Sequence, residues 1–224
     1  MILRGGELDN RRIVSETILR EASKIHARNH ADLDDGWGLG FAAREWRGRV
    51  LIWHGGGFSG VSTLLQLSPR DGVGVVVLTN GGDFAFTSRV AERFLESTLG
   101  LRSETIPGSP RGVPEDRASE WAAFTQRVQG RYRITDSVPP GVVDRLVRVT
   151  TRPRRVHVSD NQLVLEGIGM GNAFLYSDGE IGRYRLAFPF ANGARALIED
   201  RPSGTDVWAS ILHLRRRQRS STAN

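Results

Sequence analysis

The chain contains no cysteine, one lysine and no long apolar run. The absence of cysteine excludes disulfide bonds and thiol chemistry, and it is compatible with either redox compartment. No apolar run reaches the length of about 20 residues that a membrane-spanning helix needs, so we expect no membrane span. Met1-Ile2-Leu3 leads directly into Arg4 and two glycines, which is not the pattern of a signal peptide. The compartment stays undetermined.

Several motifs of nucleophilic catalysis are also absent. Lys24 is the single lysine and Glu21 stands three residues before it, so Ser-x-x-Lys cannot occur in this chain. Tyr-x-Asn and Gly-x-Ser-x-Gly do not occur either. Ser-x-Asn occurs at Ser159-Asp160-Asn161, between two expected strands of the second half of the chain. An activated serine needs a base within hydrogen-bonding distance. No serine in the sequence has a recognisable base of this kind. We therefore predict no serine nucleophile.

The net charge of +6 arises after residue 100, where nineteen arginines face thirteen acidic residues. Most of these arginines stand singly along expected strands, and thirty of the 31 basic residues of the chain are arginine. No nucleic-acid-binding motif accompanies the charge. Solvated arginines are the favoured interpretation, and we predict no nucleic-acid partner.

The most informative feature present is His54-Gly55-Gly56-Gly57, which follows the apolar segment Val50 to Trp53. A strand that ends in this way places one titratable side chain beside backbone that another molecule can approach closely. Free backbone N–H groups are also what stabilises a developing oxyanion. The flanking segments are Gly36 to Phe41 before it, and Gly60 to Leu65 and Val73 to Asn80 after it.

This ordered set of segments resembles the serine β-lactamase and penicillin-binding-protein superfamily, especially its class C-like esterases and D-aminopeptidases. In that family the third active-site motif, Lys-Thr-Gly or His-x-Gly, lies on a strand beside the catalytic cleft, and His54-Gly55-Gly56 occupies the corresponding place. The resemblance covers about the first hundred residues. It implies acyl transfer through a serine ester, with an ester, amide or peptide as substrate and no cofactor.

The resemblance also implies roles for single residues. His54 would face the substrate and influence proton transfer near the nucleophile. Gly57 would contribute a backbone N–H to the oxyanion hole. Gly55 and Gly56 would keep the strand edge free of side chains, and Phe58 and Ser59 follow on the substrate side. The structural alternatives are a strand-end histidine and a flexible turn glycine.

The family's first two catalytic motifs precede the segment that Gly6 to Asp9 resembles. Met1 to Arg4 followed by two glycines is typical of the last turn of a helix and its stop. We therefore expect the chain to be the C-terminal portion of a longer hydrolase, inactive alone, which a second chain carrying the missing motifs could complement. The family is often extracytoplasmic.

The remaining histidines suggest no metal site. His26 and His30 are four residues apart in an expected helix, a spacing that can bind a metal, but no third ligand stands in a fixed relation to them. We interpret them as surface residues and predict no metal. Trp37, Trp53 and Trp208 are expected in the core.

The pattern predicts an α+β fold, in which an antiparallel sheet flanked by helices is followed by a small antiparallel β-barrel. For residues 1–100 we expect a helix from Glu16 to about His30, strands at 37–44, 49–53, 61–67 and 73–79, and a helix from Phe84 to Leu99. Val75 to Leu78 is apolar on both faces, which favours a central strand covered by helices. Residues 101–118, with three prolines, are the expected linker.

Residues 119–217 are expected to form the barrel, and 218–224 a tail. A helix around Trp121, Phe124 and Val128 leads into strands at 154–158, 163–166, 183–190, 194–199 and 207–214. This region resembles the lipocalin-like extensions of some β-lactamase-related hydrolases. The alternative function is a non-catalytic module that binds a small ligand or a protein in a cavity lined by Tyr184, Phe188 and Phe190.

Overall fold

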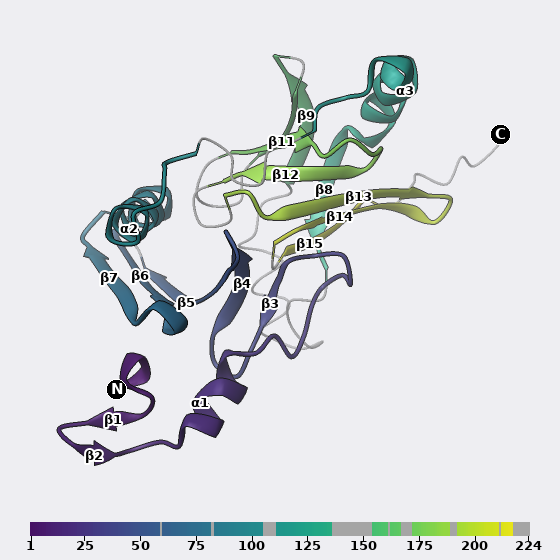
Figure 1. Ribbon diagram of the computed structural model, residues 1–224. Helices are drawn as coiled ribbons and strands as arrows, with labels where there is room; N and C mark the ends of the chain where they lie inside the picture. Colours follow the sequence, from purple (N-terminus) through teal and green to yellow (C-terminus); the bar gives the residue numbers. More distant parts are fainter. Residues whose placement is uncertain are drawn as a thin grey trace.

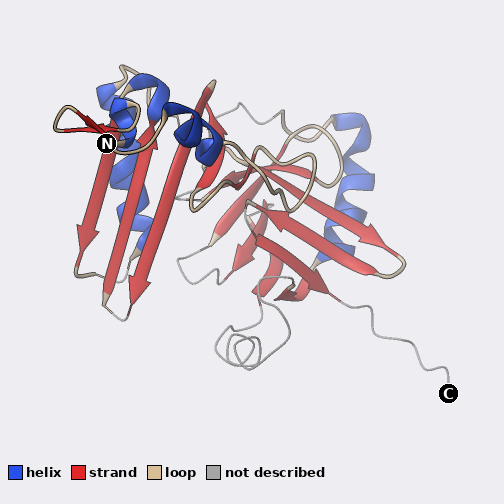
Figure 2. Ribbon diagram, turned by 90° about the horizontal axis from the view of Figure 1, so that it is seen from below, coloured by secondary structure: helices blue, strands red, loops and turns tan. Residues whose placement is uncertain are grey.

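An open five-stranded sheet and a closed eight-stranded barrel follow one another along the chain (Figure 1). This computed structural model describes residues 1–58, 60–81, 83–104, 111–135, 154–160, 162–166, 172–188, 192–210 and 212–216. The mixed fold of antiparallel sheets flanked by helices confirms the predicted fold class. Figure 2 shows the two sheets side by side.

The open sheet has the order β3-β4-β5-β6-β7, and all neighbours are antiparallel. Its strands are Asp35–Trp37, Ala42–Trp46, Arg49–Phe58, Val61–Ser68 and Val73–Thr79. A two-stranded hairpin, β1 (Glu7–Leu8) and β2 (Arg11–Arg12), precedes it. The turn η1 (Ile2–Arg4) ends at Gly5 in the left-handed conformation, as the sequence predicts.

Two expected elements of this part differ from the structure. Helix α1 spans Glu16–Ser23 and is capped by Ser15, but the helix does not reach the expected end at His30. Residues 26 and 27 instead pair with β3, because the amides of His26 and Ala27 donate to the carbonyl of Trp37. The expected single strand at 37–44 is two strands, β3 and β4, that meet at a turn containing Gly40 with φ of 85°.

Helix α2 (Phe84–Thr98) packs on β6 and β7 with its small and aliphatic face. Ala91 and Leu95 are buried there, whereas Phe86 and Phe94 are 50% and 45% exposed. The prediction of a central strand at 73–79 was wrong, because β7 is an edge strand. Its Val76 and Leu78 are 60% and 73% exposed. Apolar residues on both elements therefore lie uncovered.

The barrel is an up-and-down meander in which each strand pairs with its sequence neighbours and β8 closes on β15. The strands β8 to β15 are Gly130–Ile134, Arg154–Ser159, Gln162–Glu166, Ala173–Ser177, Arg183–Ala187, Arg195–Arg201, Gly204–Ala209 and Leu212–Arg216. The expected strand at 207–214 is two strands that turn at Ser210, which has φ of 55°. Strand β11 was not predicted, and Phe190 lies outside the described residues.

Helix α3 (Ala118–Val128) follows the short turn η3 (Glu115–Arg117) and lies against one end of the barrel (Figure 1). Its Trp121, Phe124 and Val128 are buried, as the sequence predicts. They join one core cluster with the inward side chains of the strands, including Tyr132, Leu165 and Leu186. No helix among the described residues has the length and apolar character to cross a membrane.

A buried carboxylate lies where the two sheets meet. Asp35 on β3 is 2% exposed, and neither carboxylate oxygen has a hydrogen-bond partner of normal geometry. Burial raises the pKa of Asp35 to about 6, against the opposing influence of the Ser210 hydroxyl and the Arg44 guanidinium.

We predict that Asp35→Asn stabilises the protein more at pH 7.5 than at pH 4. The raised pKa means that the folded state holds a proton between pH 3.8 and about 6 that the unfolded state has lost. Stability therefore falls as pH rises through this window, and the penalty is fully present above it. The difference between the two pH values should be on the order of 2 kcal/mol. Thermal unfolding at both pH values measures it.

The exposed carboxylate of Asp9 supplies the matched control. Asp9→Asn should follow the wild-type pH profile, and the constant effect of replacing a carboxyl by an amide cancels when each variant is compared with itself at the two pH values. A parallel profile for Asp35→Asn would contradict the assignment of a buried ionised carboxylate.

Candidate functional site

Strand β5 runs past the end of β4 and leaves an open sheet edge. Its pairing with β4 stops at Trp53, opposite Ala42, whereas its pairing with β6 continues to Phe58, opposite Val61. No other backbone hydrogen bond from a described residue reaches residues 54–58. In an antiparallel strand, alternate residues turn their N–H and C=O groups to the same side. The segment 54–58 therefore presents unpaired backbone groups on the side away from β6.

The predicted site residues that the structure describes, 54–58, lie along this edge because they are consecutive residues of β5. His54 is exposed, and no hydrogen bond or ion pair joins its side chain to another described residue. Gly55 and Gly56 are half-buried and Gly57 is exposed. All three glycines lie within the strand, without positive φ, so they are not turn residues. Phe58 ends the strand, while its side chain and Ser59 lie outside the described residues.

Thr63 on β6 adjoins the candidate edge, and sequence reasoning did not single it out. It lies opposite Gly56, and its Oγ1 donates to the Gly56 carbonyl at 3.2 Å. A Cβ on Gly56 would come within 2.9 Å of that hydroxyl oxygen. The absence of a side chain at Gly56 therefore leaves room for the Thr63 hydroxyl over β5, where it hydrogen-bonds to the Gly56 carbonyl. The signal in the sequence was a β-branched hydroxyl residue at the same distance from the hairpin turn as the glycine.

The two histidines with helical spacing do not form a site. His26 Nε2 contacts the Glu21 carbonyl oxygen at 2.8 Å. His30 lies beside the barrel, with its ring centroid 4.9 Å from that of Trp208. Within the described part of the chain, no group of three or more His, Cys, Asp or Glu residues is arranged to hold a metal ion.

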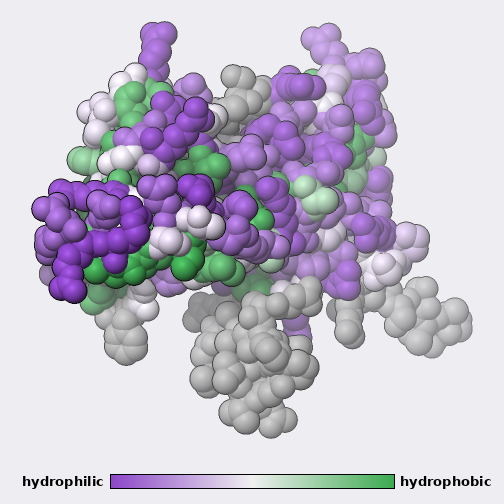
Figure 3. All heavy atoms as spheres, turned by 60° about the horizontal axis from the view of Figure 1, so that its bottom comes forward, coloured by the Kyte–Doolittle hydropathy of each residue, from purple (hydrophilic) through white to green (hydrophobic). Residues whose placement is uncertain are grey.

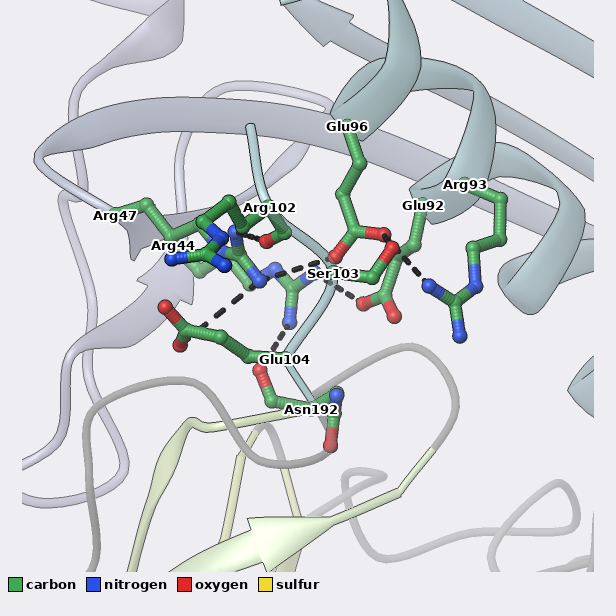
Figure 4. Close-up of polar contacts among 9 residues, drawn as sticks. All are labelled: Arg44, Arg47, Glu92, Arg93, Glu96, Arg102, Ser103, Glu104 and Asn192. Atoms are coloured by element: carbon green, nitrogen blue, oxygen red, sulfur yellow. Dashed lines mark hydrogen bonds and ion pairs between the residues drawn. The ribbon is translucent and has the colours of Figure 1, made fainter. Parts of the chain in front are cut away.

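A cluster of ion pairs anchors α2 to the sheet (Figure 4). Arg44 on β4 donates to Glu92 at 2.7 Å, and Arg47 donates to Glu96 at 3.0 Å. Figure 4 shows Arg44 also directed toward Asn192 of the barrel, whose carbonyl oxygen it contacts at 3.5 Å. Burial raises the pKa of Glu92 to about 7, and the Arg44 guanidinium opposes that effect.

The geometry of this cluster indicates a structural role. Its carboxylates are satisfied: in addition to Arg47, Glu96 accepts from Ser103 at 2.7 Å and from Arg93 of the same helix at 3.2 Å. The Arg44 side chain is almost fully buried, so it has no access for a substrate. Removing one partner of such a buried pair would leave a buried uncompensated charge. We assign the cluster to holding α2, β4 and the barrel together.

Described residues line at least three hollows elsewhere. One of about 710 Å³ is open to solvent and is lined by residues of η1, α1 and the start of β5, and its apolar residues include Leu3, Leu19 and Ile25. Figure 3 shows apolar residues at the surface beside the strongly hydrophilic N-terminal segment. The other two, of about 730 Å³ and 310 Å³, belong to the barrel. His54 lines none of these three.

No family model matches this chain, and no curated protein matches it. Among solved structures, it is similar to an octameric penicillin-binding protein homologue from Pyrococcus abyssi, with 18% identity and a TM-score of 0.40. It is also similar to SurE with D-Leu, with 16% identity and a TM-score of 0.47, and to SurE, with 15% and 0.45. The matches cover 96%, 96% and 91% of this chain. The chain spans less than half of each structure, at 44%, 48% and 42%, and likeness at this level carries no functional argument.

Proposed function

We propose that the chain contributes one wall of the active site of a β-lactamase-related serine hydrolase. The observation that carries the proposal is the open edge of β5 at His54 to Phe58, where pairing with β4 has ended. An extended acyl or peptide substrate can add to such an edge as a further strand and use its backbone groups. The glycines at 55–57 leave room for it.

In this proposal a serine outside the chain attacks the substrate carbonyl carbon. The Gly57 N–H and the amide of that serine would hold the developing oxyanion, and the exposed imidazole of His54 would relay protons beside it. A serine ester forms as the leaving group departs, and water then releases the acid. Ester, amide and peptide substrates all fit this scheme.

The same proposal retains residues 1–100 as part of the hydrolase domain, 101–118 as the linker, 119–217 as the barrel and 218–224 as a tail. The uncovered apolar residues of α2 and β7 support it, because in a complete domain such surfaces normally pack on another layer. A longer reading frame or a complementing chain would supply that layer together with the nucleophile.

The second candidate is a non-catalytic module with a ligand in the centre of the barrel. The side chains of Tyr184 and Phe188 are buried within the barrel core cluster, together with inward residues from all the other strands. A closely packed interior leaves no room for a ligand at the centre. We therefore disfavour this form of the binding hypothesis.

The open edge predicts a pattern of amide exchange. In β6, which lies between β5 and β7, every backbone amide can find a ladder partner, so all should be protected. Along residues 54–58, amides directed toward β6 should be protected, and the alternate amides should exchange much faster. Hydrogen exchange followed by NMR measures both sets. Uniform protection along residues 54–58 would show that something else covers this edge.

The purified chain should hydrolyse neither nitrocefin nor p-nitrophenyl acetate, because no Ser-x-x-Lys occurs in it. Turnover that a serine-directed inhibitor abolishes would refute this expectation. The DNA upstream of Met1, read in all frames, should encode Ser-x-x-Lys.

In a protein that joins this chain to the segment carrying Ser-x-x-Lys, His54→Ala should lower kcat/KM by about 10²-fold or more, while His157→Ala on the barrel leaves kcat/KM unchanged. Equal effects of the two variants would remove His54 from the site.

The exposed face of α2 can be tested against its buried face. Phe86→Ser with Phe94→Ser should change the free energy of unfolding of this chain by no more than about 0.5 kcal/mol, as for other exposed sites. Leu95→Ala on the buried face should cost about 2–5 kcal/mol. Chemical denaturation measures both. Equal destabilisation would mean that the aromatic face is already packed, which contradicts a missing layer.

A further inference from the structure

The end of the barrel beside α3 holds a pocket of about 730 Å³, a size typical of small-molecule sites. We call it the mouth pocket. It lies between α3, the segment before η3 and strands β9 to β12. Its lining is Gly112, Val113, Ala118, Trp121, Ala122, Thr125, Gln126, Gln129, Val158, Gln162, Leu163, Leu175, Tyr176, Ser177 and Tyr184.

The register of the strands explains why the pocket has an apolar floor. Val158, Leu163 and Leu175 are direct partners across β9, β10 and β11. Leu163 and Leu175 are buried, whereas Val158 is 37% exposed although it shares a strand face with the buried Val156. The inward face of the barrel is therefore uncovered at this end.

Helix α3 and the preceding segment form the opposite wall. The Trp121 ring stands edge-on to the Tyr184 ring, with centroids 5.9 Å apart. The small side chains of Ala118 and Ala122 leave space along the helix. The segment before η3 is fixed to β11, because Ser177 Oγ donates to the Gly112 carbonyl at 2.7 Å. The pocket is thus shaped before any ligand enters.

The described lining carries no charge. None of the fifteen described residues that line the pocket is Asp, Glu, Lys, Arg or His, although a quarter of all residues in the chain are charged. The adjoining 310 Å³ hollow differs, because Arg183, Arg185 and Glu180 are among the residues that line it. A charged molecule entering the mouth pocket would lose hydration without gaining a counter-charge. The chemistry selects an uncharged molecule.

Tyr184, one of the lining residues, carries a buried hydroxyl that is unsatisfied. Its side chain is 2% exposed, and its hydroxyl has no hydrogen-bond partner among the described residues. The other buried tyrosine of the barrel, Tyr132, donates to the Val128 carbonyl at 2.5 Å. Burial raises the pKa of Tyr184 well above its usual range, so the hydroxyl stays neutral. A buried hydroxyl without a partner is costly, and a ligand oxygen would satisfy it.

We propose that the mouth pocket binds an uncharged, largely apolar small molecule whose hydroxyl or carbonyl oxygen pairs with the Tyr184 hydroxyl. The site is separate from the open edge of β5, so it does not depend on the hydrolase proposal. The ligand would lie on the floor formed by Leu163 and Leu175 and against Trp121.

Straight-chain alkanols from hexanol to dodecanol test this proposal in the full chain. Calorimetry and the NMR signal of the Trp121 indole follow binding. Affinity should rise about three- to fourfold with each methylene, as apolar burial requires. Alkanoates and alkylammonium ions of equal length should bind at least tenfold more weakly. Equal affinity of the charged and neutral series, or no alkanol binding up to its solubility, would overturn the proposal.

Two variants locate the ligand. Ala122→Phe fills the pocket from α3 and should weaken alkanol binding at least tenfold. Its matched control, Ala123→Phe, changes an exposed neighbour that does not line the pocket and should bind as wild type does. Thermal unfolding of both variants checks that they fold. Equal binding by the two variants would place the alkanol elsewhere and refute the site.

Tyr184→Phe tests the hydroxyl. It should weaken alkanol binding about two- to tenfold, which is the range expected for one hydrogen bond. It should leave the melting temperature of the free protein unchanged or raise it, because an unsatisfied group is removed. Unchanged alkanol affinity would overturn the role of the hydroxyl, and a large fall in melting temperature would show that Tyr184 already has a partner.

Discussion

The arrangement of the molecule depends on one short loop, residues 30–34, which docks on the outer face of the barrel. Leu33 is buried there in a cluster with Leu197 and Trp208. Asp34 forms ion pairs with Arg185 at 3.3 Å and with Arg195 at 3.4 Å. Burying a leucine contributes about 1.5–3 kcal/mol, and the ion pairs fix the orientation. The loop leads directly into β3, so it sets where the open sheet begins.

That constraint reaches the candidate site through two glycines. A Cβ on Gly36 would lie 2.3 Å from the Ala27 carbonyl oxygen, and one on Gly38 would lie 2.4 Å from the Ala22 carbonyl oxygen. Glycine there lets residues 22–28 cross close to β3. The chain then turns before β4, which begins only at Ala42. Because β4 begins there, its pairing with β5 cannot extend beyond Trp53, and residues 54–58 stay open.

The sequence was sufficient to locate those strands and helices whose bounds depend on their own residues. Alternation and turn residues located β7 at residues 73–79, and the period of four located α2. The sequence did not reveal what covers an apolar face, so Val76 and Leu78 suggested a central strand although β7 lies at an edge. Pattern identifies a face as apolar, whereas tertiary packing decides whether it is buried.

The candidate site shows the same contrast between local sequence pattern and tertiary pairing. The order of segments pointed to His54 and the glycines, but propensity suggested a strand that ends at Trp53, because glycine weakens strands. The strand continues through Gly57 because β6 offers a partner at each step, including Thr63 opposite Gly56. Pairing therefore outweighed local preference, and no local pattern could show that β4 would stop first.

The barrel explains how a strongly basic segment can enclose an uncharged pocket. Strand β12 alternates Arg183, Tyr184, Arg185 and Leu186, and the tyrosine and leucine are buried in the core. The arginines point outward, where Arg183 meets Asp32 at 2.9 Å and Arg185 meets Asp178 at 3.1 Å. A period of two thus places the charge of the strand on its outer face. The same alternation that binds the barrel to the loop at 30–34 keeps the charges of β12 away from the barrel interior.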